Sequence, residues 1–412
     1  MKNKFLTEMQ SRGYIHQCTD LNKLEHISNK QSIIGYIGFD CTASSLHVGS
    51  LLQIMVLRLM QKCGHRPIVL LGGGTTLIGD PSGKDATRKI LKKDEIKSNI
   101  KKIKKVFNKI LNTSNKKIAP IYVDNYNWLS KLNYIDFLRN VGSHFTINKM
   151  LTFDSVKLRL EREQSLSYME FNYMILQAYD FYQLFKNKKC ILQIGGSDQW
   201  GNIVNGVELI RRILKKEAFG LTTPLITLSS GAKMGKTEKG AVWLNENLFS
   251  TYDYWQFWRN TDDRDVKNFL LFFTDIEADQ IDHLITKENN INNLKVLLAN
   301  EATKILHGVS AAKNAEKTAK QTFELGGVGK NLPEIKIKKI ELEKGLNILN
   351  LLSEHKIFSS KSEARRAIKS NALRIDNKIL TDETKIVKID DFHSDAIKIS
   401  FGKKKHYLLK II

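Results

Sequence analysis

A stripe of polar side chains within an apolar helical segment is the first feature of this sequence that could do chemistry. The segment 168–185 is mostly apolar and aromatic, yet Tyr173, Gln177 and Asp180 recur at intervals of four and three residues. This spacing places them on one face of a helix. Because a buried carboxylate is costly unless it is hydrogen-bonded, the three groups either form a structural network or line a polar pocket, where Asp180 would bind a ligand hydroxyl.

A glycine-rich turn followed by charged residues is the second feature. Gly72–Gly74 end an apolar stretch, and Asp80, Lys84 and Arg88 follow at four-residue intervals. The carboxylate could hold an ammonium group, and the two cations, which share a helix face at this spacing, could hold a phosphate. A solvated helix face is the alternative interpretation.

Two lysines in a glycine-rich loop are the third feature. Lys233 and Lys236 are flanked by Gly231, Gly235 and Gly240. A loop of this kind can close over a triphosphate, where its charges stabilise the transition state more than the ground state. A flexible surface loop is the alternative.

Two further turns between strand and helix carry polar residues. Thr42 and His47 lie near an expected helix start, where unbonded N–H groups suit phosphate, and Gly49 permits a close approach to the backbone. Gly196 and Asp198 end another apolar stretch. Asp198 either caps the next helix or holds a ribose hydroxyl. For the turn that carries Thr42 and His47, the alternative interpretation is a capped helix with an incidental histidine.

The elements that must position these residues alternate along the first half of the chain. Apolar stretches, each ending in glycine or a polar turn, are separated by amphipathic segments; they cover 32–39, 66–74, 117–124 and 190–197. This alternation predicts an α/β fold with a parallel sheet, in which ligands bind at the carboxyl ends of the strands.

The second half of the chain indicates further domains. Long helical patterns dominate from about residue 247 to 324, a Gly- and Lys-rich joint follows, and the last segment combines helices with short strands. We expect a Rossmann-like catalytic domain over 1–228, the lysine loop with a helical domain over 229–325, a linker over 326–344 and a small α+β domain over 345–412.

Basic residues are concentrated in two places. The run 84–117 holds 13 basic and 3 acidic residues, which indicates a solvated helix face or an RNA contact. In the last domain, Lys361, Arg365 and Lys369 form a stripe with four-residue spacing, and Arg366 lies beside it. Such a helix face suits an RNA backbone, and a solvated face is again the alternative.

Composition limits the class of protein. The 412 residues carry a net charge of +22 and are 42% hydrophobic, which is globular composition. The charge indicates either a polyanionic partner or a bias toward lysine. The four cysteines form neither a CxxC pair nor a zinc spacing, which excludes a disulfide scaffold and argues against a Cys-based metal site. No apolar run approaches the roughly 18 residues of a membrane span, and the start has no apolar signal core. We therefore expect a cytoplasmic protein.

Taken together and in this order, the motifs resemble those of bacterial-type tyrosyl-tRNA synthetases over nearly the whole chain. HVGS at 47–50 and KMGKT at 233–237 resemble the HIGH and KMSKS elements of class I synthetases. GFDCTASSLH, GGGTTLIGDPSGK, QAYD and GGSDQWGN resemble segments specific to the tyrosine enzyme, and the tail resembles a small RNA-binding module.

The resemblance implies an activity. A tyrosine–tRNA ligase forms tyrosyl-adenylate and pyrophosphate from L-tyrosine and ATP, and then transfers the tyrosyl group to the 3′ end of tRNA(Tyr). It also implies a homodimer and Mg²⁺ held mainly by the ATP phosphates, with no metal ligand from the protein.

The resemblance also implies site residues. Those at the tyrosine are Tyr36, Thr75, Asp80, Asn125, Tyr173, Gln177, Asp180, Gln193 and Gln199. Those at ATP are Gly38, Asp40, Gly49, Ser50, Gly196, Asp198 and Lys236, and those around the leaving pyrophosphate are Thr42, His47, Lys84, Arg88, Lys233, Lys236 and Thr237. The RNA-binding residues would be Lys361, Arg365, Arg366 and Lys369.

Two departures from the family pattern concern the ribose. Ser50 stands at the fourth position of HIGH, and Ile37 stands where a cysteine is common. We expect a weaker or rearranged ribose contact, with Ser50 still able to donate a hydrogen bond. Three alternatives are a nucleotidyltransferase that activates a small acid without tRNA, a non-catalytic RNA-binding or splicing protein on the same scaffold, and a tryptophan enzyme.

Overall fold

The computed structural model divides the chain into two compact units. It describes residues 4–80, 91–229, 231, 234–237, 240–323, 332, 334–343, 345–355, 357–376, 378–392, 396–402 and 405–412, with the backbone alone at 154, 155, 236, 237, 322, 323 and 405. The first unit comprises residues up to 235 together with 243–245 and 264–287, and the second comprises 236–242, 246–263 and 288–412.

A six-stranded sheet forms the centre of the first unit. Its order is β1-β6-β5-β2-β3-β4, in which β1 is antiparallel and all other neighbours are parallel. The strands are β1 (Gln17–Cys18), β2 (Ile34–Phe39), β3 (Arg66–Leu71), β4 (Ile121–Asp124), β5 (Leu192–Gly196) and β6 (Phe219–Thr223). The predicted parallel sheet is confirmed, and its four expected strands are β2 to β5.

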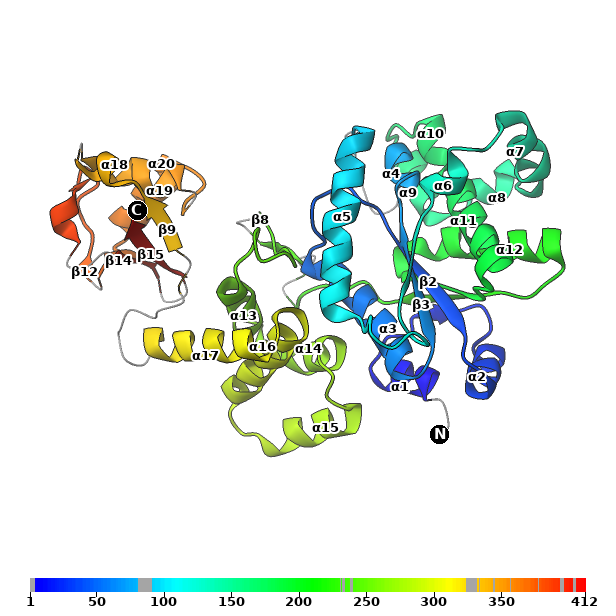
Figure 1. Ribbon diagram of the computed structural model, residues 1–412, viewed down its shortest axis with the longest axis horizontal. Coiled ribbons are helices and arrows are strands. Elements are labelled where there is room, and N and C mark those ends of the chain that lie inside the picture. Colours follow the sequence, from blue (N-terminus) through cyan, green and yellow to red (C-terminus); the bar gives the residue numbers. More distant parts are fainter. Residues whose placement is uncertain are drawn as a thin grey trace. The chain divides into compact units, whose positions relative to one another are not determined.

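Helices cover both faces of this sheet. Helices α3 (Leu51–Lys62) and α5 (Lys93–Ile110) lie on one side, and α11 (Tyr173–Lys188) and α12 (Trp200–Leu214) lie on the other (Figure 1). The core between the sheet and the second pair includes Tyr36, Leu70 and Phe181. Strand β3 is apolar over most of its length because a strand covered on both faces has no solvated side.

Shorter helices complete the first unit. They are α1 (Phe5–Ser11), α2 (Leu21–Lys30), α4 (Thr75–Ile78), α6 (Tyr126–Leu129), α7 (Tyr134–Asn140), α8 (Ile147–Leu151), α9 (Asp154–Glu161), α10 (Tyr168–Phe171), α14 (Val266–Phe273) and α15 (Ala278–Lys287). Single 3₁₀ turns lie at η1 (Val48–Ser50), η2 (Gly142–His144), η3 (Ser197–Gln199) and η4 (Asp263–Asp265).

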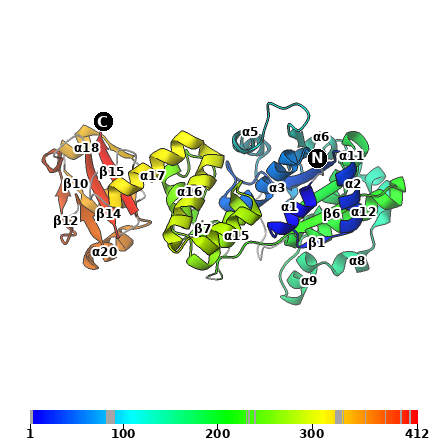
Figure 2. The ribbon, with the colours of Figure 1, turned by 90° about the horizontal axis from the view of Figure 1, so that it is seen from below.

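The second unit contains a helical part and a small α+β part. The helical part has α13 (Thr251–Arg259), α16 (Ile291–His307), α17 (Val309–Phe323) and the short pair β7 (Lys236–Thr237) and β8 (Gly240–Ala241). The α+β part has a sheet of order β12-β11-β14-β15-β9, in which β14 (Ala396–Phe401) and β15 (Lys405–Ile411) run side by side (Figure 2). Its other elements are β9 (Glu334–Ile337), α18 (Lys339–Glu343), β10 (Leu346–Asn347), α19 (Ile348–Glu354), α20 (Lys361–Lys369), β11 (Leu373–Ile375), β12 (Lys378–Ile379), β13 (Ile386–Val387) and η5 (Ile389–Asp391).

The units differ from the expected boundaries in two ways. Helices α14 and α15 were expected within a helical domain over 229–325, but they belong to the first unit, where the guanidinium of Arg12 donates hydrogen bonds to the carbonyl oxygens of Leu271, Thr274 and Ile276. The expected linker 326–344 contains β9, which pairs in parallel with β15. The segment is a strand of the C-terminal sheet, and the residues along it alternate between more exposed and more buried side chains.

No helix in the described part of the chain is long and apolar enough to cross a membrane.

Candidate active site

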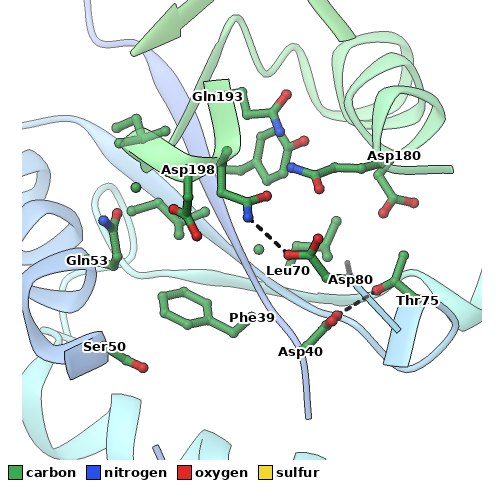
Figure 3. Close-up of a pocket in the computed structure, with 18 of the residues that line it drawn as sticks. Phe39, Asp40, Ser50, Gln53, Leu70, Thr75, Asp80, Asp180, Gln193 and Asp198 are labelled. Carbon is green, nitrogen blue, oxygen red and sulfur yellow. Dashed lines mark hydrogen bonds between the residues drawn. The ribbon is translucent and has the colours of Figure 1, made fainter. Parts of the chain in front are cut away.

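A cavity of about 320 Å³ lies at the carboxyl ends of the parallel strands. Figure 3 shows its lining side chains converging from the sheet, α3, α4 and α11. Fourteen of the residues expected at tyrosine and ATP line it: Tyr36, Gly38, Asp40, Gly49, Ser50, Thr75, Asp80, Tyr173, Gln177, Asp180, Gln193, Gly196, Asp198 and Gln199. Residues far apart in the sequence thus meet where parallel sheets bind ligands.

The buried carboxylate of Asp180 is held by two donors. Asn125 Nδ2 donates to Oδ2 at 2.8 Å, and Trp128 Nε1 donates to Oδ1 at 2.7 Å. Burial raises the pKa of Asp180 to about 7, although these two hydrogen bonds oppose that shift. The residue is 2% exposed and lines the cavity, so a ligand there meets a strong acceptor.

Asn125 itself does not line the cavity. Its Oδ1 accepts a hydrogen bond from the Gly74 backbone N–H at 2.7 Å, and its Nδ2 also donates to Thr75 Oγ1 at 3.0 Å. This amide therefore joins the glycine-rich turn after β3 to Asp180 on α11. Asn125 was expected at the tyrosine; in this geometry it is a positioning residue behind the cavity wall.

Two polar groups that were expected at the tyrosine are buried without a hydrogen-bond partner among the described residues. These are the Tyr36 hydroxyl and Gln193 Oε1, both in the cavity lining. Burial raises the pKa of Tyr36 well above its ordinary value, and the nearby Asp180 adds to that effect, so the phenol stays a neutral donor. Buried polar atoms are normally hydrogen-bonded, so their lack of a partner beside a cavity indicates that a ligand supplies one.

The other carboxylates of the cavity are hydrogen-bonded to neighbouring residues. Asp40 Oδ1 accepts from Thr75 Oγ1 at 2.9 Å, and its Oδ2 accepts from the Tyr173 hydroxyl at 3.3 Å. Asp80 Oδ2 accepts from Gln199 Nε2 at 3.0 Å. Together with Asp180 and Asp198 these groups make the cavity strongly acidic, which suits an ammonium group.

Two glycines at the strand ends lie in close contact with carboxylates of the cavity. A Cβ on Gly72 would come within 2.5 Å of Asp40 Oδ1, and one on Gly196 would come within 2.6 Å of Asp198 Oδ1. Asp198 lies in η3, and α12 begins at Trp200 with no side-chain capping hydrogen bond. The N-cap residues of η3 and α12 are Gly196 and Gln199, so Asp198 is not the N-cap residue of either helix.

The turn at 47–50 contacts the loop that carries the predicted lysines. His47 Nδ1 accepts a hydrogen bond from the Gly49 backbone N–H at 3.0 Å. A Cβ on Gly235 would lie 2.8 Å from the Gly49 backbone nitrogen. Gly235 has a φ of 88°, so glycine is needed both for conformation and for space. Thr42 is exposed in the preceding loop.

Some predicted residues lie outside the described part of the chain. Lys84, Arg88 and Lys233 are among them, and for Lys236 and Thr237 only the backbone is described. The basic residues Lys361, Arg365, Arg366 and Lys369 are all exposed on α20, whose opposite face buries Ala364, Ala367 and Ile368. Arg365 Nε lies 3.3 Å from a carboxylate oxygen of Glu383.

Sequence reasoning missed two residues whose polar side-chain groups contribute to the site. Trp128 was not predicted because a tryptophan after a strand gives no sign of what its indole N–H meets. Gln53 on α3 was not predicted either, although it lines the cavity, as Figure 3 shows. Its one signal is its position three residues after Ser50, which places both on one helix face.

Comparisons with known proteins give a consistent result. The family described as class I tRNA synthetases (W and Y) matches residues 28–324, and the C-terminal domain of SYY-like tyrosine–tRNA ligases matches 324–409. The tyrosine–tRNA ligase of Pelagibacter ubique is 60% identical over 410 residues, covering 100% of both chains. That of Rickettsia massiliae is 50% identical over 99% of this chain and 100% of its own.

Solved structures agree in fold. A C-terminally truncated mitochondrial tyrosyl-tRNA synthetase from Aspergillus nidulans superposes with a TM-score of 0.70 at 30% identity, covering 77% of this chain and 94% of its own. The parallel sheet and the cavity at its strand ends are those of a class I aminoacyl-tRNA synthetase. Within that class, the chain belongs to the tyrosyl-tRNA synthetase family.

Proposed function

We propose that this chain is a tyrosine–tRNA ligase that forms tyrosyl-adenylate from L-tyrosine and ATP, and then esterifies the 3′ end of tRNA(Tyr). One observation supports this most directly. The Tyr36 hydroxyl, which lacks a partner among the described residues, shares the cavity with the Asp180 carboxylate. The hydroxyl of a tyrosine ligand can accept a hydrogen bond from Tyr36 and donate one to Asp180. An indole can only donate, and a plain phenyl ring can do neither.

The acidic groups around the same cavity suit the other end of tyrosine. We assign the ammonium group to Asp80, Tyr173 and Gln177, as in the family pattern. Gln199, which donates to Asp80, fixes that carboxylate in place. Thr75 and Gln193 complete this part of the lining.

The chemical step is an in-line displacement. A tyrosine carboxylate oxygen bonds to the α-phosphorus of ATP, the bond from that phosphorus to the bridging oxygen breaks, and pyrophosphate leaves with the electron pair. No enzyme atom becomes covalently attached, so catalysis comes from positioning and from stabilising negative charge. We propose that Asp40 and Asp198 position the amino acid and the ribose. The groups proposed around the pyrophosphate are Thr42, His47, Lys84, Arg88, Lys233, Lys236 and Thr237.

We propose that Mg²⁺ accompanies ATP and is held mainly by its phosphates, whose charge it neutralises. The described residues contain no group of three or more His, Cys, Asp or Glu side chains arranged to hold a metal ion. Since the phosphates hold the ion in this proposal, we assign no protein ligand.

Tyrosine-dependent exchange of pyrophosphate into ATP tests the activation step, with phenylalanine and tryptophan as controls. We expect exchange with tyrosine alone. Exchange with tryptophan alone would contradict the assignment of Tyr36 and Asp180 to a phenol. No exchange with any of the three in folded protein would reject the ligase and favour the RNA-binding alternative.

The exposed basic face of α20 supports binding of tRNA in the second step. We expect replacement of Lys361, Arg365 and Lys369 by glutamate to lower the rate of tRNA charging by at least tenfold, because about three phosphate contacts are lost. Pyrophosphate exchange should not change. The matched control replaces three exposed lysines of the same domain outside α20, namely Lys336, Lys338 and Lys339. Equal loss of charging in both triple variants would contradict a specific role for α20.

We also propose that the chain forms a homodimer in the cytoplasm. Large apolar side chains are exposed on α7 to α10, within residues 134–168. They are Tyr134, Ile135, Leu138, Ile147, Leu151, Leu158, Leu160 and Tyr168. An exposed apolar surface of this extent is typical of a protein interface.

A further inference from the structure

The chain that follows the lysine loop returns to the turn that carries His47. Residues 243–245 belong to the first unit, although the residues on either side of them belong to the second. Trp243 forms an antiparallel bridge with His47, and the Leu244 backbone N–H donates to the Leu46 carbonyl oxygen at 2.9 Å. Leu244 is fully buried. These contacts tie the end of the loop to the turn expected at the pyrophosphate.

The side chains of this bridge also meet. The imidazole of His47 and the indole of Trp243 have ring centroids 6.4 Å apart and planes inclined at 68°, which is an edge-to-face arrangement. A Cβ added to Gly49 would lie 2.6 Å from the imidazole, and one added to Gly235 would lie 2.9 Å from its Nδ1. The ring is therefore close to its own turn, to Gly235 before β7 and to Trp243 after β8.

One nitrogen of the imidazole is already used within the turn. His47 Nδ1 accepts the hydrogen bond from the Gly49 backbone N–H at 3.0 Å. Because an accepting nitrogen carries no proton, the neutral ring has its proton on Nε2. Nε2 is therefore the atom that can donate to a phosphate oxygen. The direction of this donor depends on the rotation of the ring, which the indole of Trp243 limits by packing against it.

We propose that Trp243 is a positioning residue whose indole holds the His47 imidazole in the orientation that donates to a phosphate of ATP. This inference rests on the proposed function, in which His47 lies at the leaving pyrophosphate. Negative charge grows on the pyrophosphate as its bond to the α-phosphorus breaks. A donor that is already oriented stabilises this charge more than it stabilises bound ATP. Trp243 should therefore affect kcat more than either KM.

The test compares wild type with Trp243→Leu in tyrosine-dependent pyrophosphate exchange. We expect kcat to fall about two- to tenfold, the range for loss of one aromatic pair, while the KM values for ATP and tyrosine change less than about twofold. Trp243→Phe keeps an aromatic ring and should recover most of the lost rate. A leucine variant with the kcat of wild type, or a phenylalanine variant as slow as the leucine variant, would overturn the proposal.

Removal of His47 decides whether Trp243 acts through the imidazole. His47→Ala should lower kcat, and adding Trp243→Leu to it should change kcat little further, because no imidazole is left to orient. If Trp243→Leu lowers kcat by the same factor with and without His47, the indole does not act through this ring and the proposal fails. Wild type without tyrosine-dependent exchange would reject the proposed function and, with it, this inference.

A control variant separates orientation of His47 from stability of the fold. Phe272 on α14 is also partly buried, its ring centroid lies 5.8 Å from that of Tyr14, and neither residue lines the cavity. Phe272→Leu should lower the melting temperature without changing kcat. An equal fall in kcat in both leucine variants would assign the effect to stability. If Trp243→Leu does not fold, Trp243→Met, which fills more of the space without a ring, is measured in its place.

Discussion

At the scale of single residues, Asp180 shows how the site holds a charge that the fold alone would disfavour. Its carboxylate is buried, and burial raises its pKa to about 7, while the donors of Asn125 and Trp128 limit that rise. An apolar residue would cost the fold less at this position. A carboxylate held ready by two fixed donors makes sense as a partner for a substrate hydroxyl.

This carboxylate predicts a pH dependence of stability. The folded chain keeps the Asp180 proton up to about pH 7, whereas the unfolded chain loses it near pH 4. The unfolded state therefore binds fewer protons between these values, and the contribution of Asp180 to the free energy of unfolding falls as pH rises. Asp180→Asn cannot titrate. Urea unfolding from pH 5 to 8 should show the free energy of wild type falling relative to that variant.

Asp275 provides the matched control for this experiment. Burial alone would raise its pKa, but hydrogen bonds from Arg58 and Lys62 lower it to about 2. This carboxylate is then ionised in both the folded and the unfolded chain throughout pH 5 to 8. The difference in the free energy of unfolding between wild type and Asp275→Asn should stay constant over this range. Parallel behaviour of the two variants would contradict the raised pKa of Asp180.

At the scale of elements, the contact between Gly235 and the 47–50 turn predicts a kinetic defect. Gly235→Ala adds a Cβ beside the Gly49 nitrogen and imposes a left-handed backbone cost of about 1–2 kcal/mol. We expect kcat for pyrophosphate exchange to fall by tenfold or more, because the lysine loop can no longer contact the turn. The Kd for tyrosine, measured by equilibrium dialysis, should not change.

Gly231→Ala separates the contact from the backbone strain. Gly231 also has a positive φ, of 80°, but a Cβ added there would have no described atom within 4 Å. This variant carries a similar conformational cost with no steric conflict, so its kcat should stay near that of wild type. Equal losses in both variants would mean that strain within the loop, and not the contact with Gly49, causes the defect.

Elements with a strong local pattern could be predicted from the sequence, and those defined by distant partners could not. Strands β2 to β5 were predicted because they are apolar runs that end in glycine or a polar turn. Strands β1 and β6 were missed, since β1 has two residues and is a strand only because it pairs with β6. Strand β9 was taken for a linker for the same reason: its partner, β15, lies about 70 residues later.

The same distinction holds within the candidate site. The Tyr173, Gln177 and Asp180 stripe could be predicted because helical spacing alone puts its members together. Gln53 could not, because its amide in the cavity lining is hydrogen-bonded to Thr223, which is 170 residues away. Asn125 was predicted from family resemblance, but its place behind Asp180 depends on how α6 and α11 pack.

At the scale of the whole molecule, the exposed apolar side chains of α7 to α10 predict the oligomeric state. Ile135 is 68% exposed and Ile147 is 59% exposed. Glutamate at both positions costs the isolated chain little, because each side chain already faces solvent, but it buries charge in a dimer that covers them. Sedimentation equilibrium at micromolar concentration should show a dimer for wild type and a monomer for Ile135→Glu/Ile147→Glu.

Leu248→Glu is the control variant. Leu248 is an apolar residue outside 134–168 that is 47% exposed, so this variant should remain dimeric. A monomeric wild type, or a double variant that stays dimeric, would place the interface elsewhere or remove it.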